Sequence, residues 1–499
     1  MTDPTSLPEE TLDPTTPEEW EALRALGHQM VDQVVAFHRQ VGEGPAWQPV
    51  PADVRGRFQG PLPSGGAPVD ETVDRFWADV FPYHLGNVHP RGWGWVNGTG
   101  STLGALADLM ASSMNVNCAG ADTAARYVEE QVLDTLKHAM GWPASGSGIL
   151  TSGASLANLI GLAAARDRAV HRLTGLDAGA AGLLEAGARL TFYTSASAHN
   201  SVDRAIRLLG LGTDQLRRVP VDDAWRMDLQ ALRDAIAQDR EAGAVPAAIV
   251  GTAGTVDQGA IDPLDALADL AAEQGMWLHV DGAFGAVAAL SPALRPLVSG
   301  MERADSLAFD LHKWMHVPIE AGCVLVRDPA HHKRPFAAPA AYLAPLARGL
   351  AAVDDWFFEF GPQLTRGFRA LKSWFFLMHH GTDKLGRLVE QNVRQTQRLA
   401  ALMDAHPRLE ILARGPLCVL CFRYRAPDMD PATLDRFNQE LLGDLQESGR
   451  AQVTATRVGG SFTLRLALTN HRTRDGDLTG FLEDLVALGD RRKAGGALA

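Results

Sequence analysis

The strongest constraint on the fold comes from polar residues that stand at the ends of short apolar runs. Asp281 closes the run Trp277–Val280, and His312-Lys313-Trp314 follows the run Ser306–Phe309. Short runs as apolar as these are typical of strands that are buried on both faces of a parallel sheet. A buried aspartate needs a partner, because an unpaired charge in the interior carries a large desolvation penalty.

Strand candidates alternate with helical stretches between about residue 97 and residue 372. The strand candidates are Leu190–Thr194, Ala247–Gly251, Trp277–Val280, Ser306–Phe309 and Cys323–Val326, and the helices include Leu156–Ala169 and Pro263–Glu273. This alternation predicts an α/β domain with a mostly parallel central sheet and helices on both faces. Such sheets bind ligands at the carboxyl ends of their strands, where Asp281 and Lys313 are expected to lie.

Two smaller regions flank this domain. Residues 1–96 contain a capping box at Thr16, an amphipathic helix after it, a proline-rich stretch (42–68) predicted to be an extended linker, and a second helix near 71–80. These helices cannot form a core alone, so they are expected to pack on something else, such as a second subunit. Residues 373–499 predict a small α+β domain, with strands near Leu417–Tyr424 and Ser461–Leu468.

Composition and charge narrow the class of protein. The net charge of −13, with acidic and basic residues interspersed, argues against a nucleic-acid-binding surface. The acidic start is unlike a signal peptide, and the most apolar long stretch, 103–121, carries polar residues that make it a poor membrane span. The four cysteines show no complete zinc-site spacing, which predicts no metal and a cytoplasmic location. Cys418 and Cys421 form a CxxC whose apolar setting favours core residues over a redox pair.

The pairing of Asp281 with Lys313 predicts the cofactor pyridoxal 5′-phosphate (PLP). A lysine amine forms a Schiff base with the cofactor aldehyde, and a carboxylate keeps the pyridine nitrogen protonated so that the ring accepts electrons. Gly282 and Ala283 are small and would let a flat ring lie close to the backbone. The alternatives are a helix N-cap for Asp281 and a solvated surface position for Lys313.

Two other segments suit the same cofactor. Gly148–Ser155 runs from a short apolar segment into a loop that opens a helix, and the free N–H groups of a helix start bind phosphate. A plain serine cap is equally compatible with this segment. His199 follows the Leu190–Thr194 strand and could stack on the ring face opposite Ala283, or be structural.

With those residues in place, the chain resembles the PLP-dependent group II amino-acid decarboxylases, the family of aromatic-L-amino-acid, histidine and glutamate decarboxylases. The resemblance covers nearly the whole chain, and its motifs are Thr151–Asn158, His199, Leu278–Asp281, His312–Trp314 and Arg369–Trp374. It implies the type I PLP fold, which is aspartate aminotransferase-like. It also implies a homodimer with intertwined N-terminal helices and shared active sites.

The resemblance implies roles for individual residues. Lys313 matches the Schiff-base lysine and Asp281 the pyridinium partner, while Ala283 and His199 match the two residues that sandwich the ring. Phosphate contacts are implied at Ala154, Ser155 and His312, and a cofactor or substrate contact is implied at Thr252.

Tyr342 falls on the loop where decarboxylases of this family keep a catalytic tyrosine. That tyrosine protonates the carbanion left after carbon dioxide departs, whereas relatives with phenylalanine there tend to make aldehydes oxidatively. Tyr342 therefore favours plain decarboxylation. A loop anchor is the alternative reading of this residue.

Departures from the family pattern fall near the substrate end. Asn97-Gly98 replaces the Pro-Thr usual in aromatic decarboxylases, and Thr365 stands where Gly or Ser is usual. Trp93 and Trp95 could line an aromatic pocket or pack in the core. Arg126 could meet an acidic substrate side chain or form a salt bridge. The side-chain specificity therefore stays open.

The sequence thus predicts PLP-dependent decarboxylation of an L-amino acid, and it favours an aromatic one of the Trp, Tyr, Phe or DOPA type. One alternative is a non-aromatic substrate: an acidic amino acid, histidine or diaminobutyrate. Another is an aldehyde synthase or an aminotransferase, for which Arg465 is the candidate carboxylate clamp. A non-enzymatic interaction module is a third, against which Lys313, Asp281 and His199 argue.

Overall fold

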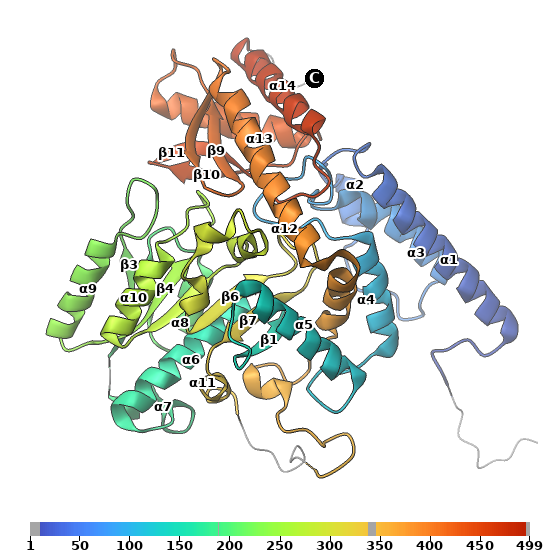
Figure 1. Ribbon diagram of the computed structural model, residues 1–499. Coiled ribbons are helices and arrows are strands. Elements are labelled where there is room, and N and C mark those ends of the chain that lie inside the picture. Colours follow the sequence, from blue (N-terminus) through green and yellow to red (C-terminus); the bar gives the residue numbers. More distant parts are fainter. Residues whose placement is uncertain (1–9, 188, 338–345, 496–499) are drawn as a thin grey trace, which may run out of the picture.

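A seven-stranded sheet forms the centre of the molecule (Figure 1). The computed structural model describes residues 10–187, 189–337 and 346–495. The strands lie in the order β1–β7–β6–β5–β4–β2–β3. Their bounds are β1 (Ser147–Thr151), β2 (Leu190–Ser195), β3 (Leu216–Val219), β4 (Val245–Thr252), β5 (Trp277–Asp281), β6 (Ser306–Asp310) and β7 (Gly322–Val326). The five predicted strands are confirmed, and β1 and β3 complete the sheet.

The direction of the strands decides which residues meet. The pairs β2–β3, β2–β4, β4–β5 and β5–β6 are parallel, whereas β7 is antiparallel to both β1 and β6. In this sheet β7 is thus the strand that runs against the others. The carboxyl ends of β1, β2, β4, β5 and β6 therefore share one edge, which confirms the mostly parallel sheet and gives ligands one place to bind.

Helices cover both faces of the sheet, as predicted. On one face lie α6 (Ala154–Thr174) and α8 (Ser201–Leu208); on the other lie α5 (Ala124–Met140), α9 (Leu229–Glu241), α10 (Leu264–Gln274) and α12 (Arg369–Asp404). Successive strand residues alternate between the two cores. In β5, Trp277 packs in the α6-side core, while Leu278 and Val280 pack in the other.

A buried ion pair supports the end of β1. Arg366 and Glu129, each 1% exposed, lie 2.5 Å apart. Glu129 accepts the Leu150 backbone N–H at 3.1 Å, and Arg366 donates to the Leu150 carbonyl at 2.9 Å. Because both backbone groups of this strand residue are held, the loop that follows β1 starts from a defined position.

The small C-terminal domain is α+β, as predicted. Its four strands form an antiparallel sheet in the order β10–β11–β9–β8, and it forms the upper part of Figure 1. The elements are β8 (Leu409–Arg414), β9 (Val419–Tyr424), α13 (Pro431–Glu447), β10 (Thr454–Val458), β11 (Ser461–Ala467) and α14 (Asp475–Lys493). The predicted helix at 385–405 is the second part of α12, which kinks at Gly381, where φ is 68°.

The N-terminal region projects away from the sheet (Figure 1). The predicted capping box forms at Thr16 and starts α1 (Pro17–Gln40), a helix without buried residues. The prediction of a linker without regular structure was wrong at α2 (Ala52–Gly56), where Pro51 precedes a single helical turn. The second predicted helix is α3 (Val69–Arg75), continued by a π-helical turn over Phe76–Val80. The next α-helix is α4 (Thr102–Met114), which directly precedes α5 along the chain.

The cysteines lie in the interior. All four are free and buried, and burial raises the pKa of the Cys421 thiol to about 12. The CxxC residues therefore belong to the core, as expected. Across the three described ranges, no helix combines the length and apolar character that crossing a membrane would need.

Candidate active site

A cavity of about 320 Å³ opens at the carboxyl edge of the sheet. The loops that follow β1, β2, β5 and β6 all contribute to its wall. It is lined by Ser152, Gly153, Ala154, Ser155, Leu156, His199, Ser201, Asp281, Ala283, Asp310, His312, Lys313 and Glu320. Residues predicted from four separate motifs thus meet in one place, because parallel strands bring their carboxyl ends together.

Asp281 ends β5 and is 3% exposed. Its Oδ2 accepts a hydrogen bond from the Asn158 amide at 2.9 Å, and its Oδ1 accepts the Ala283 backbone N–H at 3.1 Å. No helix in the described chain starts at Asp281, so the N-cap alternative does not apply. The carboxylate is held at the cavity wall with small residues beside it.

Lys313 reaches the cavity with its side chain 24% exposed. Its Nζ lies 3.0 Å from Oδ2 of Asp310, the last residue of β6. The other oxygen of Asp310, Oδ1, accepts the Ala154 backbone N–H at 2.6 Å. Asp310 was not among the site residues predicted from the sequence. The pattern that indicated Asp281 could also have indicated Asp310. Asp310 is likewise an acid at the end of a buried strand, and it lies three residues before Lys313.

The start of α6 lies beside these charges. Gly153 is the N-cap of this helix and carries no side chain to cap it, so the serine-cap alternative does not form. The loop packs closely on β7, since a Cβ on Gly322 would lie 2.5 Å from the Gly153 Cα. Ala154 is buried and Ser155 is exposed at the helix start. Backbone N–H groups at such a start attract anions.

Two histidines, His199 and His312, line the cavity. His199 is exposed, and its Nδ1 accepts the Ser201 backbone N–H at 3.2 Å. Loss of surrounding water lowers the His199 pKa, while the Asp281 charge opposes this shift. His312 receives the Ala321 backbone N–H on Nδ1 at 3.1 Å. Burial lowers its pKa, and Asp310 opposes that shift. Both rings are therefore neutral bases near neutral pH.

The predicted substrate-pocket residues do not line this cavity. Trp93 is 1% exposed, donates its indole N–H to Thr473 at 3.0 Å and packs on Phe481, so it takes the core alternative. Trp95 and Thr365 are exposed. None of the three appears among the residues that form the cavity wall.

The segment Asn97-Gly98 lies directly against the lysine segment. A Cβ on Gly98 would lie 1.9 Å from the His312 carbonyl oxygen and 2.4 Å from that of Lys313. The replacement of Pro-Thr by Asn97-Gly98 therefore has a steric consequence. With glycine at position 98, the backbone approaches the Lys313 segment more closely than a residue with a side chain would allow. Asn97 itself accepts the Thr469 hydroxyl on its carbonyl at 3.0 Å.

The two arginines of the alternative hypotheses are engaged elsewhere. Arg126 pairs with Glu130 at 2.8 Å and donates to the Asp355 carbonyl at 2.7 Å, which is the salt-bridge alternative. Arg465 is 3% exposed and donates to the Trp95 carbonyl at 2.9 Å. Neither contributes to the cavity wall. Tyr342 lies outside the described residues.

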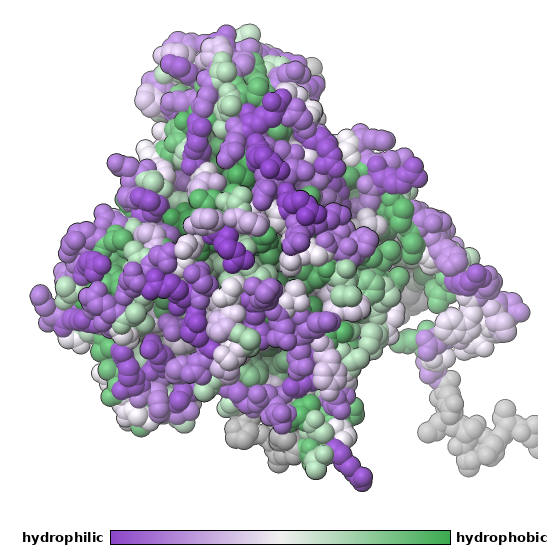
Figure 2. Space-filling view, in the orientation of Figure 1, coloured by the Kyte–Doolittle hydropathy of each residue, from purple (hydrophilic) through white to green (hydrophobic). Residues whose placement is uncertain are grey.

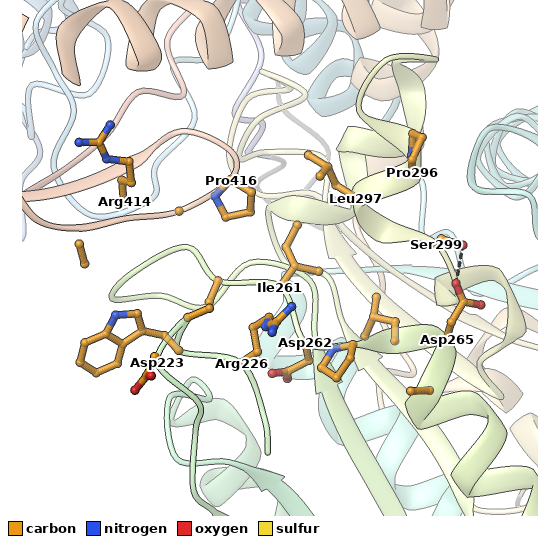
Figure 3. Close-up of a pocket in the computed structure, with 18 of the residues that line it drawn as sticks. Asp223, Arg226, Ile261, Asp262, Asp265, Pro296, Leu297, Ser299, Arg414 and Pro416 are labelled. Atoms are coloured by element: carbon orange, nitrogen blue, oxygen red, sulfur yellow. Dashed lines mark hydrogen bonds between the residues drawn. The ribbon is translucent and has the colours of Figure 1, made fainter. Parts of the chain in front are cut away.

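A larger cavity, of about 900 Å³, lies where the small domain meets the sheet domain (Figure 3). Its wall comes from residues 223–226, 260–266, 296–297, 299 and 412–416. Both arginines of this wall have ionic partners, Arg226 with Asp222 at 2.8 Å and Arg414 with Asp404 at 2.7 Å. It contains no lysine or histidine among its lining residues. Reactive groups therefore gather in the smaller cavity.

The smaller cavity fits PLP. Lys313 supplies an amine, Asp281 a carboxylate for a ring nitrogen, and the start of α6 an anion site. Thr252 pairs with Asp281 across β4 and β5, and its Oγ1 is buried without a hydrogen-bond partner in the described chain. A buried hydroxyl without a partner is costly, so a ligand contact would satisfy it. Within the described ranges, no cluster of three or more His, Cys, Asp or Glu side chains could hold a metal ion.

A comparison with protein families decides the identity. The family model for the pyridoxal-dependent decarboxylase conserved domain matches residues 82–425. The chain belongs to the pyridoxal-dependent decarboxylase family. It is therefore a PLP-dependent carboxy-lyase that acts on an amino acid, and the predicted family, cofactor and reaction class are confirmed.

The relatives are similar over nearly their whole length. An aromatic-L-amino-acid decarboxylase of Bacillus atrophaeus is 29% identical, covering 94% of this chain and 96% of the relative. Tryptophan decarboxylase 1 of Oryza sativa subsp. japonica is 30% identical, with 89% of each chain covered. Among solved structures, Oryza sativa TDC with PLP and tryptamine has a TM-score of 0.88 at 27% identity, covering 97% of this chain and all of the other. The type I PLP fold is confirmed.

Non-aromatic decarboxylases share the fold as well. The glutamate decarboxylase domain of the diaminobutyrate-pyruvate transaminase and L-2,4-diaminobutyrate decarboxylase from Vibrio parahaemolyticus has a TM-score of 0.84 at 27% identity, covering 96% of this chain and 97% of the other. The fold alone therefore does not select the side chain of the substrate.

Proposed function

We propose that this decarboxylase acts on an aromatic L-amino acid and releases its amine and carbon dioxide. The observation that carries the proposal is the meeting of Lys313, Asp281 and the start of α6 in one cavity of about 320 Å³. The full-length similarity to aromatic-amino-acid and tryptophan decarboxylases supports the aromatic class.

In this proposal the residues at the cavity hold the cofactor. Lys313 would bind the aldehyde carbon, and Asp281 would keep a proton on the pyridine nitrogen. Ala283 and His199 would pack against the ring. Ala154, Ser155, Thr252 and His312 would bind the phosphate and the remaining cofactor atoms. When bound, PLP accepts the electron pair of the broken Cα–carboxylate bond.

The protein groups control where charge and protons go. His199, with Nδ1 occupied by the Ser201 N–H, presents its other nitrogen to the substrate carboxylate. The Asp281 charge favours electron flow away from the α-carbon. Tyr342 then donates a proton to the α-carbon. Trp95, Asn97 and Thr365 belong to the part of the pocket that a second subunit completes, while buried Trp93 acts as its support.

We also propose a cytoplasmic homodimer with shared active sites. Apolar side chains are exposed on the N-terminal helices and on α4, and Figure 2 shows apolar atoms gathered near the junction of these elements. These residues are Trp20, Leu23, Met30, Val35, Leu109, Met110 and Met114. A second copy would cover them. The chain is then divided into a dimer-forming segment (1–96), the PLP-binding domain (97–372) and the small domain (373–499).

The test is a substrate panel with full-length, PLP-loaded protein. Carbon dioxide and amine are measured for Trp, Tyr, Phe, DOPA, Glu, His and 2,4-diaminobutyrate. We expect equal amounts of both products from at least one aromatic substrate. Amine formation from the acidic or basic substrates alone would replace the aromatic assignment with the non-aromatic alternative.

The Tyr342→Phe variant distinguishes decarboxylation from aldehyde formation. We expect it to lose amine production and, with dioxygen as the oxidant and water as the oxygen source of the aldehyde, to gain aldehyde, ammonia and hydrogen peroxide from the same substrate. Wild-type protein that already forms aldehyde would identify an aldehyde synthase, and turnover that depends on a 2-oxoacid would identify an aminotransferase.

A further inference from the structure

A chain of buried polar side chains lies behind Asp281, on the side away from the cavity. Trp277, His279 and Asp281 occupy alternate positions of β5 and so point to the same face of the sheet, toward α6. Ser306 on β6 pairs directly with His279, and Asn158 comes from α6. The side chains are almost fully buried, each at most 3% exposed.

The donor and the acceptor of each hydrogen bond in this row of side chains can be assigned. The Trp277 indole can only donate, and it donates to the Ser306 Oγ at 2.8 Å. The Ser306 hydroxyl hydrogen is then free for the His279 Nδ1, 2.7 Å away. Burial lowers the His279 pKa to about 3, so the ring is neutral. A neutral ring that accepts on Nδ1 must carry its hydrogen on Nε2.

Asn158 connects His279 to the residues at the cavity. The His279 Nε2–H donates to the Asn158 Oδ1 at 2.9 Å, which fixes the side-chain amide with its NH₂ group toward the strand ends. That NH₂ group donates to the Asp281 Oδ2 and to the Ser201 Oγ, both at 2.9 Å. The Ser201 hydroxyl hydrogen is thereby directed to the His199 Nδ1, also 2.9 Å away.

The packing of α6 leaves room for this arrangement. A Cβ on Gly161 of α6 would lie 2.6 Å from the His279 Nδ1 and 3.0 Å from the Ser306 Oγ. Any larger residue at position 161 would displace the imidazole or the hydroxyl. The close approach of the helix to β5 and β6 is therefore part of what holds the chain together.

We infer that Asn158 and His279 are positioning residues for the reaction. They hold the Asp281 carboxylate aimed at the cavity, and they hold the His199 ring with its Nε2–H toward the ligand. One buried network thus sets both groups that face the cofactor ring. The inference rests on the proposed roles of Asp281 and His199.

The first test compares two substitutions of one residue. In His279→Gln, the amide NH₂ and carbonyl oxygen can replace the Nε2–H and the Nδ1, whereas His279→Leu keeps the bulk and removes both. PLP affinity is measured by equilibrium dialysis of the full-length proteins. We expect Gln to stay close to wild type and Leu to bind PLP at least about tenfold more weakly, the size of effect seen when outer partners of metal ligands are removed. Equal losses in both variants would overturn the inference and leave a packing role.

A second pair controls for buried charge in general. Asn158→Asp places an oxygen against the Asp281 carboxylate. Asn438→Asp makes the same change at a fully buried helix asparagine in the small domain, where the amide bonds the Tyr424 backbone. Both variants are expected to lower the unfolding temperature, but only Asn158→Asp is expected to weaken PLP binding. A similar weakening in both would overturn the inference.

The histidine hydrogens give a readout that needs neither PLP nor turnover. In protein labelled with ¹⁵N-histidine, we expect His279 to show the Nε2–H form throughout pH 5 to 9, a range well above its pKa of about 3. We expect His199 to show that form near neutral pH and to lose its preference in Ser201→Ala. An Nδ1–H form of His279 would overturn the inference. A wild-type protein that binds no PLP would instead count against the proposed function.

Discussion

The cavity between the domains and the cavity at the carboxyl edge of the sheet differ in size and in chemistry, and the smaller one carries the function. The larger, about 900 Å³, lies between the domains, and several of its polar side chains are bonded to neighbouring residues, as Ser299 is to Asp265 in Figure 3. The smaller, about 320 Å³, gathers Lys313, two histidines and two aspartates. The larger volume therefore reflects loose packing between two domains. The reactive side chains gather instead in the smaller cavity, where the parallel strands end.

The largest expected effect concerns the amine of the smaller cavity. Lys313→Ala should reduce turnover by several orders of magnitude, because the only lysine of this cavity wall is removed. The measurement is amine release together with the absorbance of bound cofactor. If the variant kept its turnover, the smaller cavity would not be the site of the reaction.

Asp281→Asn should have the next largest effect. The amide keeps the shape but cannot balance a positive charge on the ring nitrogen, so we expect kcat to fall about a hundredfold, comparable to the loss of one group that stabilises charge in a transition state. Kinetics with the best substrate provide the check, with Asp262→Asn as the matched control. Asp262 is another buried acid near the end of a strand, but it lines the larger cavity.

Asp310→Asn sharpens the comparison within the smaller cavity. The carboxylate lies 3.0 Å from the Lys313 Nζ and accepts the Ala154 N–H at the proposed phosphate site. Removing its negative charge should strengthen PLP binding up to about tenfold, or about 1.4 kcal/mol, since two anions no longer repel. Equilibrium dialysis at low and high salt measures this. Weaker binding would show that Asp310 serves as an ion-pair partner more than as a competitor of phosphate.

The smallest effect is expected in the larger cavity. Arg226→Ala removes a surface ion pair with Asp222, in which the arginine side chain is 53% exposed. Such pairs contribute at most about 1 kcal/mol, so the unfolding temperature should change little and the kinetics should not change. A marked loss of turnover would give the larger cavity a role in the reaction.

Local pattern was sufficient for the main parts of the fold and the site. Strand and helix periods are properties of neighbouring residues, so β2, β4, β5, β6 and β7 were predicted from the sequence. The same holds for the grouping of Asp281 with Lys313, because residues at the ends of adjacent parallel strands must meet. The motif around Thr151–Asn158 was placed at a helix start for the same reason.

Contacts between distant segments were decided by the tertiary structure alone. No pattern indicated that Asp310 would hold both Lys313 and the Ala154 N–H, or that Trp93 would lie in the core against Phe481. The orientation of the Asn158 amide depends on how closely α6 crosses β5 and β6, which Gly161 permits. The sequence by itself thus determined which chemical groups reach one edge of the sheet. Only the packing of helix on sheet decided which hydrogen bonds orient them, because hydrogen-bond direction depends on three-dimensional distances that a local sequence period does not contain.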